Sequence, residues 1–240
     1  MPNSKERVTC HNFILDSLSQ QEYDRLLPEL EEIELRQGTI LYQAREPNTV
    51  IYFPTTALLS WTNSTLEGEM VEVGMTGSEG MTGALLLLGE NTLPYQVQVQ
   101  LAGRAFKLPT PTFVDVLRNS IALQQKIAAF VYFNVTQLAQ SALCNRFHTV
   151  EERLCRWLLT AQDRTQTSDL ALTHDILAEM IGARRPAVSL IKGVLQSAGL
   201  VQAGRGRITI LNREEMEAAA CECYHLVKAE FDRYCRTPNG

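Results

Sequence analysis

The sequence offers little from which a metal or redox centre could be built by spacing alone. It has six cysteines and four histidines, and the one closely spaced pair, Cys221 and Cys223, is separated by one residue where zinc knuckles use two. On a single helix these two thiols would lie about 200° apart. We therefore expect reduced structural cysteines and no metal site. The remaining cysteines and the histidines are scattered: Cys10, Cys144, Cys155, Cys235, His11, His148, His174 and His225.

Signatures of catalysis and of membrane insertion are also missing. The sequence has no nucleophile elbow, phosphate loop, metalloprotease helix or paired dinucleotide glycines, and Gly77-Ser78-Glu79-Gly80 matches none of these. No uninterrupted apolar run approaches membrane-spanning length, and no apolar signal region follows the polar residues 1–7. We expect a cytoplasmic protein that is not an enzyme, and 240 residues suffice for two domains.

The strongest positive signal lies between His174 and Gly193. Two short apolar stripes at helical spacing flank Gly182, which permits a sharp turn because glycine adopts positive φ without strain. The pattern predicts a helix-turn-helix whose second helix, about residues 184–195, enters a DNA major groove. Pro186 suits the first turn of that helix. The stripes are Ile176, Leu177, Met180 and Ile181, then Val188, Ile191, Val194 and Leu195.

The side chains left outside these stripes are mostly basic. Arg184, Arg185 and Lys192, with Ser189 among them, suit phosphate oxygens and guanine edges. Thr173 is the expected N-cap of the first helix, where its hydroxyl or the first-turn amides could meet a phosphate. The alternative for this segment is an ordinary helical hairpin with a solvated basic surface.

A short hairpin pattern follows the helix pair. The segment 203–207, Ala-Gly-Arg-Gly-Arg, lies between apolar residues and predicts a tight β-hairpin with Arg205 and Arg207 at its tip, within reach of the DNA backbone. Residues 172–213 hold six basic and two acidic side chains, whereas residues 1–117 hold seven basic and fifteen acidic ones. The whole chain has a net charge of −5. Positive charge is therefore concentrated where DNA would bind.

The rest of the chain shows three patterns. Residues 18–34 predict an acidic helix burying Tyr23, Leu26, Leu27 and Leu30, and short apolar runs across 35–107 predict an antiparallel barrel or roll. From 112 to about 145 the pattern is helical and apolar on several sides, which fits either a long core helix or a connecting helix paired with its copy in a dimer. A further helix over 150–161 leads to a polar linker at 163–169.

This order of elements resembles the Crp/Fnr family, that of the cyclic-AMP receptor protein and the fumarate–nitrate reduction regulator. The resemblance implies an α+β chain with a cyclic-nucleotide-binding-like antiparallel β-roll sensor domain and N-terminal helix at 1–117. It further implies a long dimerisation helix at 118–145 and a C-terminal winged helix-turn-helix at 146–240. The similarity is strongest from Val150 to Leu211 and runs through Ala178, Gly182, Arg185, Val188, Ile191 and Leu195.

The resemblance also implies a function. Family members are homodimeric transcription regulators that bind palindromic double-stranded DNA, and RNA polymerase is a further candidate partner. By resemblance, Arg184, Arg185 and Ser189 would meet bases and Thr173 and His174 phosphates, while helix geometry adds Lys192. Pro186 occupies a recognition position where the best-known members have Glu, so their operator consensus does not transfer. The alternative, from another class, is a ligand-sensing module whose helix pair contacts protein rather than DNA.

The signal-sensing devices of the family are not evident. Nucleotide-binding members hold the cyclic phosphate with a Gly-Glu pair and an Arg-Ser or Arg-Thr pair before a strand, and Leu93-Pro94 stands at the corresponding place. Burying a phosphate without the arginine that neutralises it costs several kcal/mol of binding free energy, so we expect a degenerate nucleotide site that is not controlled by cyclic AMP. We expect the glycine-rich stretch 74–83 to form turns of the roll. Iron–sulfur members carry a cysteine cluster near the N-terminus, where this sequence has only Cys10. Haem-binding members use paired ligands such as a Cys and a His in the roll, and residues 35–107 contain neither. No cofactor is predicted, and a small-molecule effector stays unidentified.

Overall fold

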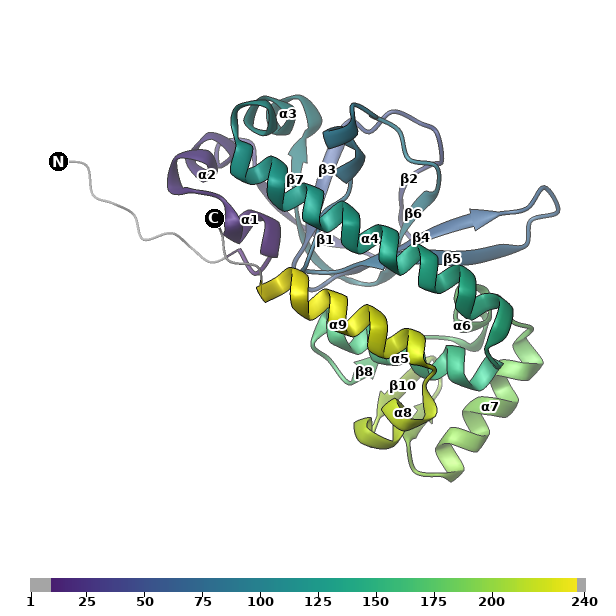
Figure 1. The fold of residues 1–240 in the computed structure, drawn as a ribbon. Helices are drawn as coiled ribbons and strands as arrows, with labels where there is room; N and C mark the ends of the chain where they lie inside the picture. Colours follow the sequence, from purple (N-terminus) through teal and green to yellow (C-terminus); the bar gives the residue numbers. More distant parts are fainter. Residues whose placement is uncertain (1–9, 237–240) are drawn as a thin grey trace.

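The structure, a computed structural model, describes residues 10–236. Figure 1 shows a β-roll above a smaller helical domain, with two long antiparallel helices alongside both. The N-terminal part consists of α1 (Phe13–Ser17), α2 (Gln20–Leu26), β1 (Glu31–Leu35), β2 (Ile40–Tyr42), β3 (Val50–Pro54), β4 (Leu58–Ser64), β5 (Met70–Thr76), η1 (Ala84–Leu88), β6 (Gln96–Leu101) and β7 (Gly103–Pro109).

The strands form the antiparallel roll that the sequence predicts. One sheet has the order β1-β7-β3 and the other β2-β6-β4-β5. Within each sheet, every pair of neighbouring strands is antiparallel. Apolar side chains fill the second sheet's inner side, where the indole of Trp61 stacks on the ring of Tyr95 at 5.0 Å between centroids. Gly80 is required by close approach, because an added Cβ would lie 2.0 Å from the Phe130 ring.

The predicted helix over 18–34 is wrong in its second half. Helix α2 ends at Leu26, Leu27 is 50% exposed, and residues 31–35 form β1. Pro28 has no N–H to continue the helix. The glutamates that made this segment look like an acidic helix pair instead with cations on β7, where Glu31 lies 3.0 Å from Lys107 and Glu32 lies 3.2 Å from Arg104.

The predicted helix from 112 onward is two helices, α3 (Thr110–Asn119) and α4 (Ile121–Phe147). Ser120 separates them in an extended conformation, and its hydroxyl accepts a hydrogen bond from the Leu123 N–H at 3.0 Å. An N-cap of this kind starts a new helix and so favours the break. Helix α4 by itself satisfies a length-and-composition test for a membrane span, with 39% of its most apolar window buried.

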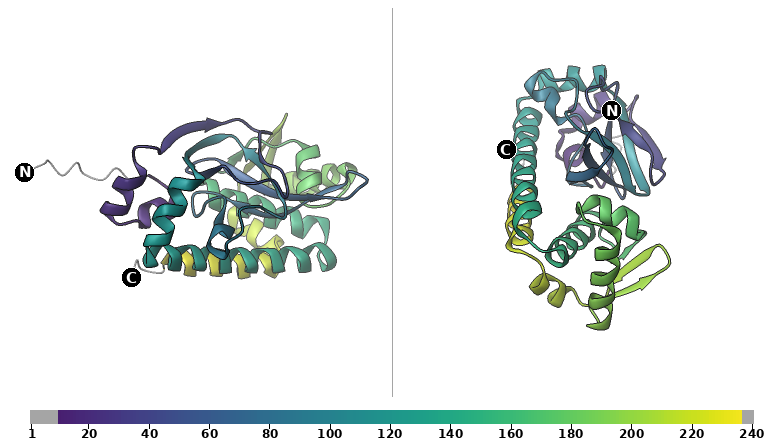
Figure 2. Two further views of the ribbon diagram at one scale, coloured as in Figure 1. Left: turned by 90° about the horizontal axis from the view of Figure 1, so that it is seen from above. Right: turned by 90° about the vertical axis from the view of Figure 1, so that its right-hand side faces the viewer.

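Helix α9 (Glu222–Arg236) covers one side of α4. The two helices run antiparallel along the edge of the molecule, with the roll and the smaller domain beside them (Figure 2). Their contact is aromatic, because Phe133 of α4 stacks on Tyr234 and meets Phe231 edge-on, with centroids 5.9 and 6.1 Å apart. The opposite side of α4 is exposed, at positions spaced by three and four residues: Ala128, Tyr132, Val135, Ala139 and Ala142.

The smaller domain carries the predicted helix pair and hairpin. It contains α5 (Val150–Thr165), β8 (Asp169–Leu170), α6 (His174–Met180), α7 (Arg185–Ser197), β9 (Val201–Gly204), β10 (Arg207–Ile210) and α8 (Arg213–Ala219). Helix α5 is longer than predicted and takes up the first part of the expected linker. Its N-cap is a capping box, in which Thr149 and Glu152 satisfy each other's backbone N–H groups.

A buried carboxyl group links the roll to this domain. The Trp157 indole on α5 donates to Glu72 Oε1 of β5 at 2.8 Å, and the Ser60 hydroxyl of β4 bonds the other carboxyl oxygen. Burial raises the pKa of Glu72 to about 7, against the smaller opposing effects of Ser60, Arg156 and Trp157. The neutral carboxyl group is therefore the form that this interface favours.

Glu72→Gln is expected to remove a pH dependence of stability. Because the folded-state pKa of Glu72 is raised, the native state favours protonation, and wild-type stability falls as the pH rises from about 4.5 through 7. The variant stays neutral and should gain up to about 3 kcal/mol relative to wild type across that window. Urea unfolding at pH 5 and pH 8 measures this gain. If the free energies of unfolding of the two proteins differed by the same amount at pH 5 and pH 8, the role given to Glu72 would be contradicted.

Candidate DNA-binding surface

The helix pair forms as the sequence predicts. Thr173 is the N-cap of α6, its hydroxyl accepting the Ile176 N–H at 3.2 Å, and Pro186 lies in the first turn of α7. Gly182 has φ of +58° and makes the turn between the helices. An added Cβ at Gly182 would also lie 3.2 Å from Val71 of β5, so the turn packs closely on the roll.

One member of the second apolar stripe was placed wrongly. The first stripe is buried apart from Ile176, which is half-buried, and in α7 Val188 and Leu195 are buried and Ile191 is half-buried. Val194 is 47% exposed, and Leu190, one turn before it, is 68% exposed. The buried face of α7 is therefore narrower than the pattern suggested, and it leaves an apolar strip beside the polar one.

Polar groups from both helices converge at the start of α7. The His174 Nδ1 atom lies 3.0 Å from the Ser189 hydroxyl, and Arg185 Nε lies 3.1 Å from an Asp175 oxygen. Partial burial, with added repulsion from Lys192 and Arg185, lowers the pKa of His174, which keeps the ring neutral near pH 7. These contacts gather His174, Arg185, Ser189 and Lys192 on one surface, with the exposed Arg184 at the N-cap of the helix.

The hairpin β9–β10 extends this surface. Arg205 and Gly206 form its turn, with Gly206 at φ of +70°, whereas Arg207 already belongs to β10 rather than to the tip. A Cβ built at Gly206 would lie 4.0 Å from the Thr173 side chain. The turn of the wing and the start of α6 are thus neighbours, and Thr173 joins the two halves of the surface.

Two acidic side chains on this surface escaped the sequence analysis. Asp175 pairs with Arg185, and Asp169 of β8 pairs with Arg207. Both pairs are largely exposed, so each stabilises the free protein by no more than about 1 kcal/mol, and phosphates can compete for the arginines. The pairing of β8 with β10 brings Asp169 there, and no spacing in the sequence signals it.

Comparison with known proteins identifies this domain. A sequence profile described as the Crp-like helix-turn-helix domain matches residues 152–219, the segment that holds the helix pair and the wing. The match assigns a Crp-like helix-turn-helix domain to this part of the chain. No curated protein sequence matches it.

Solved structures show that the fold is shared along most of the chain. FixK2 from Bradyrhizobium japonicum is 15% identical with a TM-score of 0.68, over 80% of this chain and 98% of that one. A transcriptional regulator of the Crp/Fnr family from Eubacterium rectale is 16% identical, with a TM-score of 0.66 over 86% and 96%. The c-di-GMP-responsive global regulator CLP from Xanthomonas campestris is 14% identical, with a TM-score of 0.63 over 81% of this chain and 100% of that one. The roll, long helix and helix-turn-helix predicted from the sequence are thereby confirmed.

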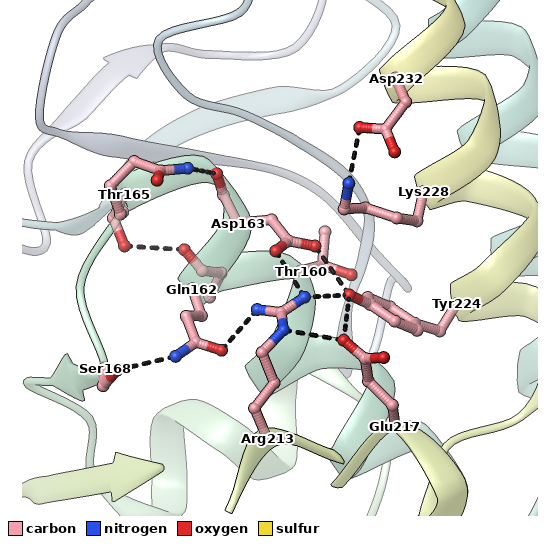
Figure 3. A network of polar contacts seen from close by, with 12 residues as sticks. Thr160, Gln162, Asp163, Thr165, Ser168, Arg213, Glu217, Tyr224, Lys228 and Asp232 are labelled. Carbon is pink, nitrogen blue, oxygen red and sulfur yellow. Dashed lines mark hydrogen bonds and ion pairs between the residues drawn. The ribbon is translucent and has the colours of Figure 1, made fainter. Parts of the chain in front are cut away.

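One of the six cations counted in the basic segment 172–213 stabilises the fold instead of facing DNA. Arg213, the first residue of α8, lies 2.8 Å from Asp163 of α5 and 2.7 Å from Glu217, and it also bonds Gln162 and Tyr224 (Figure 3). It therefore anchors the chain leaving the wing to α5 and α9. The positive charge available to DNA is smaller than the sequence count implied.

The roll's hairpin β4–β5 faces α6 and the turn that follows it. A cleft of about 740 Å³ lies between the hairpin and the helix pair, lined by residues that include Met70, Val71, Asp175, Glu179 and Arg184. Arg184 is thus in a position where a change in the hairpin would alter its surroundings.

A cluster of thiols at the junction of α4 and α9 contradicts the expectation of scattered cysteines. Cys144, His148, Cys221 and Cys223 have their donor atoms all within 4.8 Å of one another. The helical argument that separated Cys221 from Cys223 was wrong, because α9 begins at Glu222 and Cys221 precedes it. Contact with Cys221, supported by Arg156 and His148, lowers the pKa of the Cys144 thiol to about 5.

Proposed function

We propose that this protein is a transcription regulator of the Crp/Fnr type, which acts as a homodimer and binds a palindromic DNA site through two copies of α7. The observation that carries the proposal is the surface on which Arg185, Ser189 and Lys192 of α7 gather around His174, with Arg184 at the N-cap of α7 and the wing beside it. Arginine there can bond guanine bidentately while the wing arginines Arg205 and Arg207 meet the backbone. Thr173 and His174 complete the phosphate contacts.

The exposed side of α4 supports the dimer. Its apolar or small side chains recur at three- and four-residue spacing, the pattern by which two helices pair. Tyr132 and Val135 are each 57% exposed. Pairing of α4 with its copy would bury them and set the two recognition helices about 34 Å apart, one turn of DNA.

The signal would be sensed in residues 1–117 and transmitted through 118–145 to the DNA-binding domain at 146–240. The Glu72–Trp157 bond and the hairpin facing α6 support this path. Control by cyclic AMP is not expected, because Leu93 is buried where the family's phosphate-binding arginine would precede β6. The regulator works without catalysis, in the cytoplasm, and RNA polymerase is its proposed protein partner.

Arg185→Ala is expected to weaken binding to a selected operator by about 5- to 150-fold, or about 1–3 kcal/mol, because a bidentate base contact is lost. The operator is obtained by selection from a random DNA library, and titrations at several salt concentrations measure affinity and salt slope.

Arg118→Ala is the matched control, since Arg118 is an exposed arginine on α3, outside the helix-turn-helix domain. It should bind like wild type. Unchanged affinity and salt slope for Arg185→Ala would refute this placement of the contact. Absence of any salt-dependent DNA binding by the wild type would instead favour the ligand-sensing module.

A further inference from the structure

The thiol cluster sits where three helices meet. Cys144 is in the last turn of α4 and His148 caps that helix, while Cys221 and Cys223 flank the start of α9. The Cys144 and Cys221 sulfurs are 3.5 Å apart, and the Cys223 sulfur is 3.6 Å from His148 Nδ1. We propose that these four side chains bind one zinc ion, independently of the function proposed above.

The distances fit a tetrahedral ion. Zinc bonds of about 2.3 Å to sulfur and about 2.0 Å to nitrogen place two tetrahedral sulfurs about 3.8 Å apart, and a sulfur and a nitrogen about 3.5 Å apart. The Cys144–Cys221 and Cys223–His148 distances lie near these values, and all pairs of donor atoms fall within 4.8 Å. Three thiolates and one imidazole are a donor set of structural zinc sites, and the closeness of the donors suits a single ion.

The groups around the cluster match the surroundings of a bound metal. His148 turns its other nitrogen, Nε2, to Glu222 at 3.2 Å, and metal-bound histidines commonly donate that N–H to a carboxylate. Arg156 of α5 is 92% buried and interacts with Cys144, while its Nε has no partner among the described residues. Three thiolates and Zn²⁺ leave one negative charge, which this guanidinium would offset.

A disulfide between Cys144 and Cys221 explains less of the arrangement. It would use two of the four groups and leave the contact between Cys223 and His148, and the Glu222 pairing, without a role. Disulfides are also rare in a reducing cytoplasm. A zinc ion instead uses every donor in the cluster.

The ion would fix the corner between the long helix and the DNA-binding domain. His148 is followed directly by Thr149, the N-cap of α5, so the junction of α4 and α5 is one half of the site. The other half comes from Cys221, between α8 and α9, and from Cys223 on α9, about 75 residues later in the chain. Zinc would therefore hold α9 to the junction and keep the DNA-binding domain in one orientation relative to α4.

Zinc content of the reduced full-length protein tests the proposal. The expected result is one zinc ion per chain by elemental analysis. The zinc content should fall at least about tenfold in Cys144→Ser and Cys223→Ser, because each substitution removes a side chain that binds the ion directly. Cys235→Ser is the matched control on α9, outside the cluster, and should keep its zinc. Replacement by Co²⁺ should give the absorption of a tetrahedral cobalt thiolate.

Glu222→Gln separates metal binding from folding, because Glu222 is 67% exposed in its side chain and its loss should not harm the core. Zinc affinity by chelator competition should fall about 10- to 100-fold. The proposal is overturned if the reduced wild type binds neither Zn²⁺ nor Co²⁺, if Cys235→Ser loses as much metal as Cys223→Ser, or if Cys144 and Cys221 are isolated as a disulfide.

Discussion

Glu79→Gln is expected to lower the free energy of unfolding by about 3–5 kcal/mol, a large effect for a change that keeps the side chain's shape. Glu79 Oε1 lies 3.4 Å from Arg164 Nη1, and both side chains are only 2% exposed. The substitution would leave the guanidinium charged and buried without its counter-charge. Urea unfolding of the two proteins measures the loss.

The surroundings of Arg164 explain why little else can compensate. Its guanidinium lies over the rings of Phe231, at 4.2 Å, and Phe133, at 4.8 Å. Its Nε and Nη1 have no hydrogen-bond partner within residues 10–236. The pair thus joins the loop after β5 to α5 between α4 and α9, and its loss should loosen the two domains from each other.

Glu32→Gln is the matched control. Glu32 also pairs with an arginine, Arg104 at 3.2 Å, but the two side chains are 48% and 58% exposed. Exposed pairs contribute about 0–1 kcal/mol, so this variant should unfold almost like wild type. Equal losses in the two variants would show that burial of the Glu79 pair has no energetic consequence.

Val135→Asp is expected to dissociate the proposed dimer and, with it, tight binding to the palindrome. The side chain lies in the middle of the exposed side of α4, so pairing would bury two aspartates against each other. The dimer dissociation constant should rise at least about 100-fold, the equivalent of about 3 kcal/mol. Sedimentation and operator titration measure the two effects.

Leu27→Asp provides the comparison, since Leu27 is 50% exposed against 57% for Val135 but lies at the end of α2. It should leave the dimer intact. A Val135→Asp protein that sediments like wild type would place the dimer contact elsewhere on the chain, without affecting the assignment of α7 to DNA.

The sequence predicted best where local signals agreed. Thr173, Gly182 and Pro186 are an N-cap, a turn residue and a first-turn residue, and each took that place because its backbone preference acts within a few residues. Prediction failed where a local preference met a competing one. Pro28 ended a helix that acidic composition favoured, and Ser120 divided another.

The sequence by itself determined the elements and the basic recognition helix, because period, capping and turn chemistry are properties of neighbouring residues. Only the tertiary structure decided which cations are free for DNA, since Arg213 is held by Asp163 and Glu217. It alone also placed Cys144 and His148 beside Cys221 and Cys223. The two halves of this cluster are about 75 residues apart in the chain. The packing of whole helices, rather than the spacing of residues along the chain, brings their donor atoms close enough to share one metal ion.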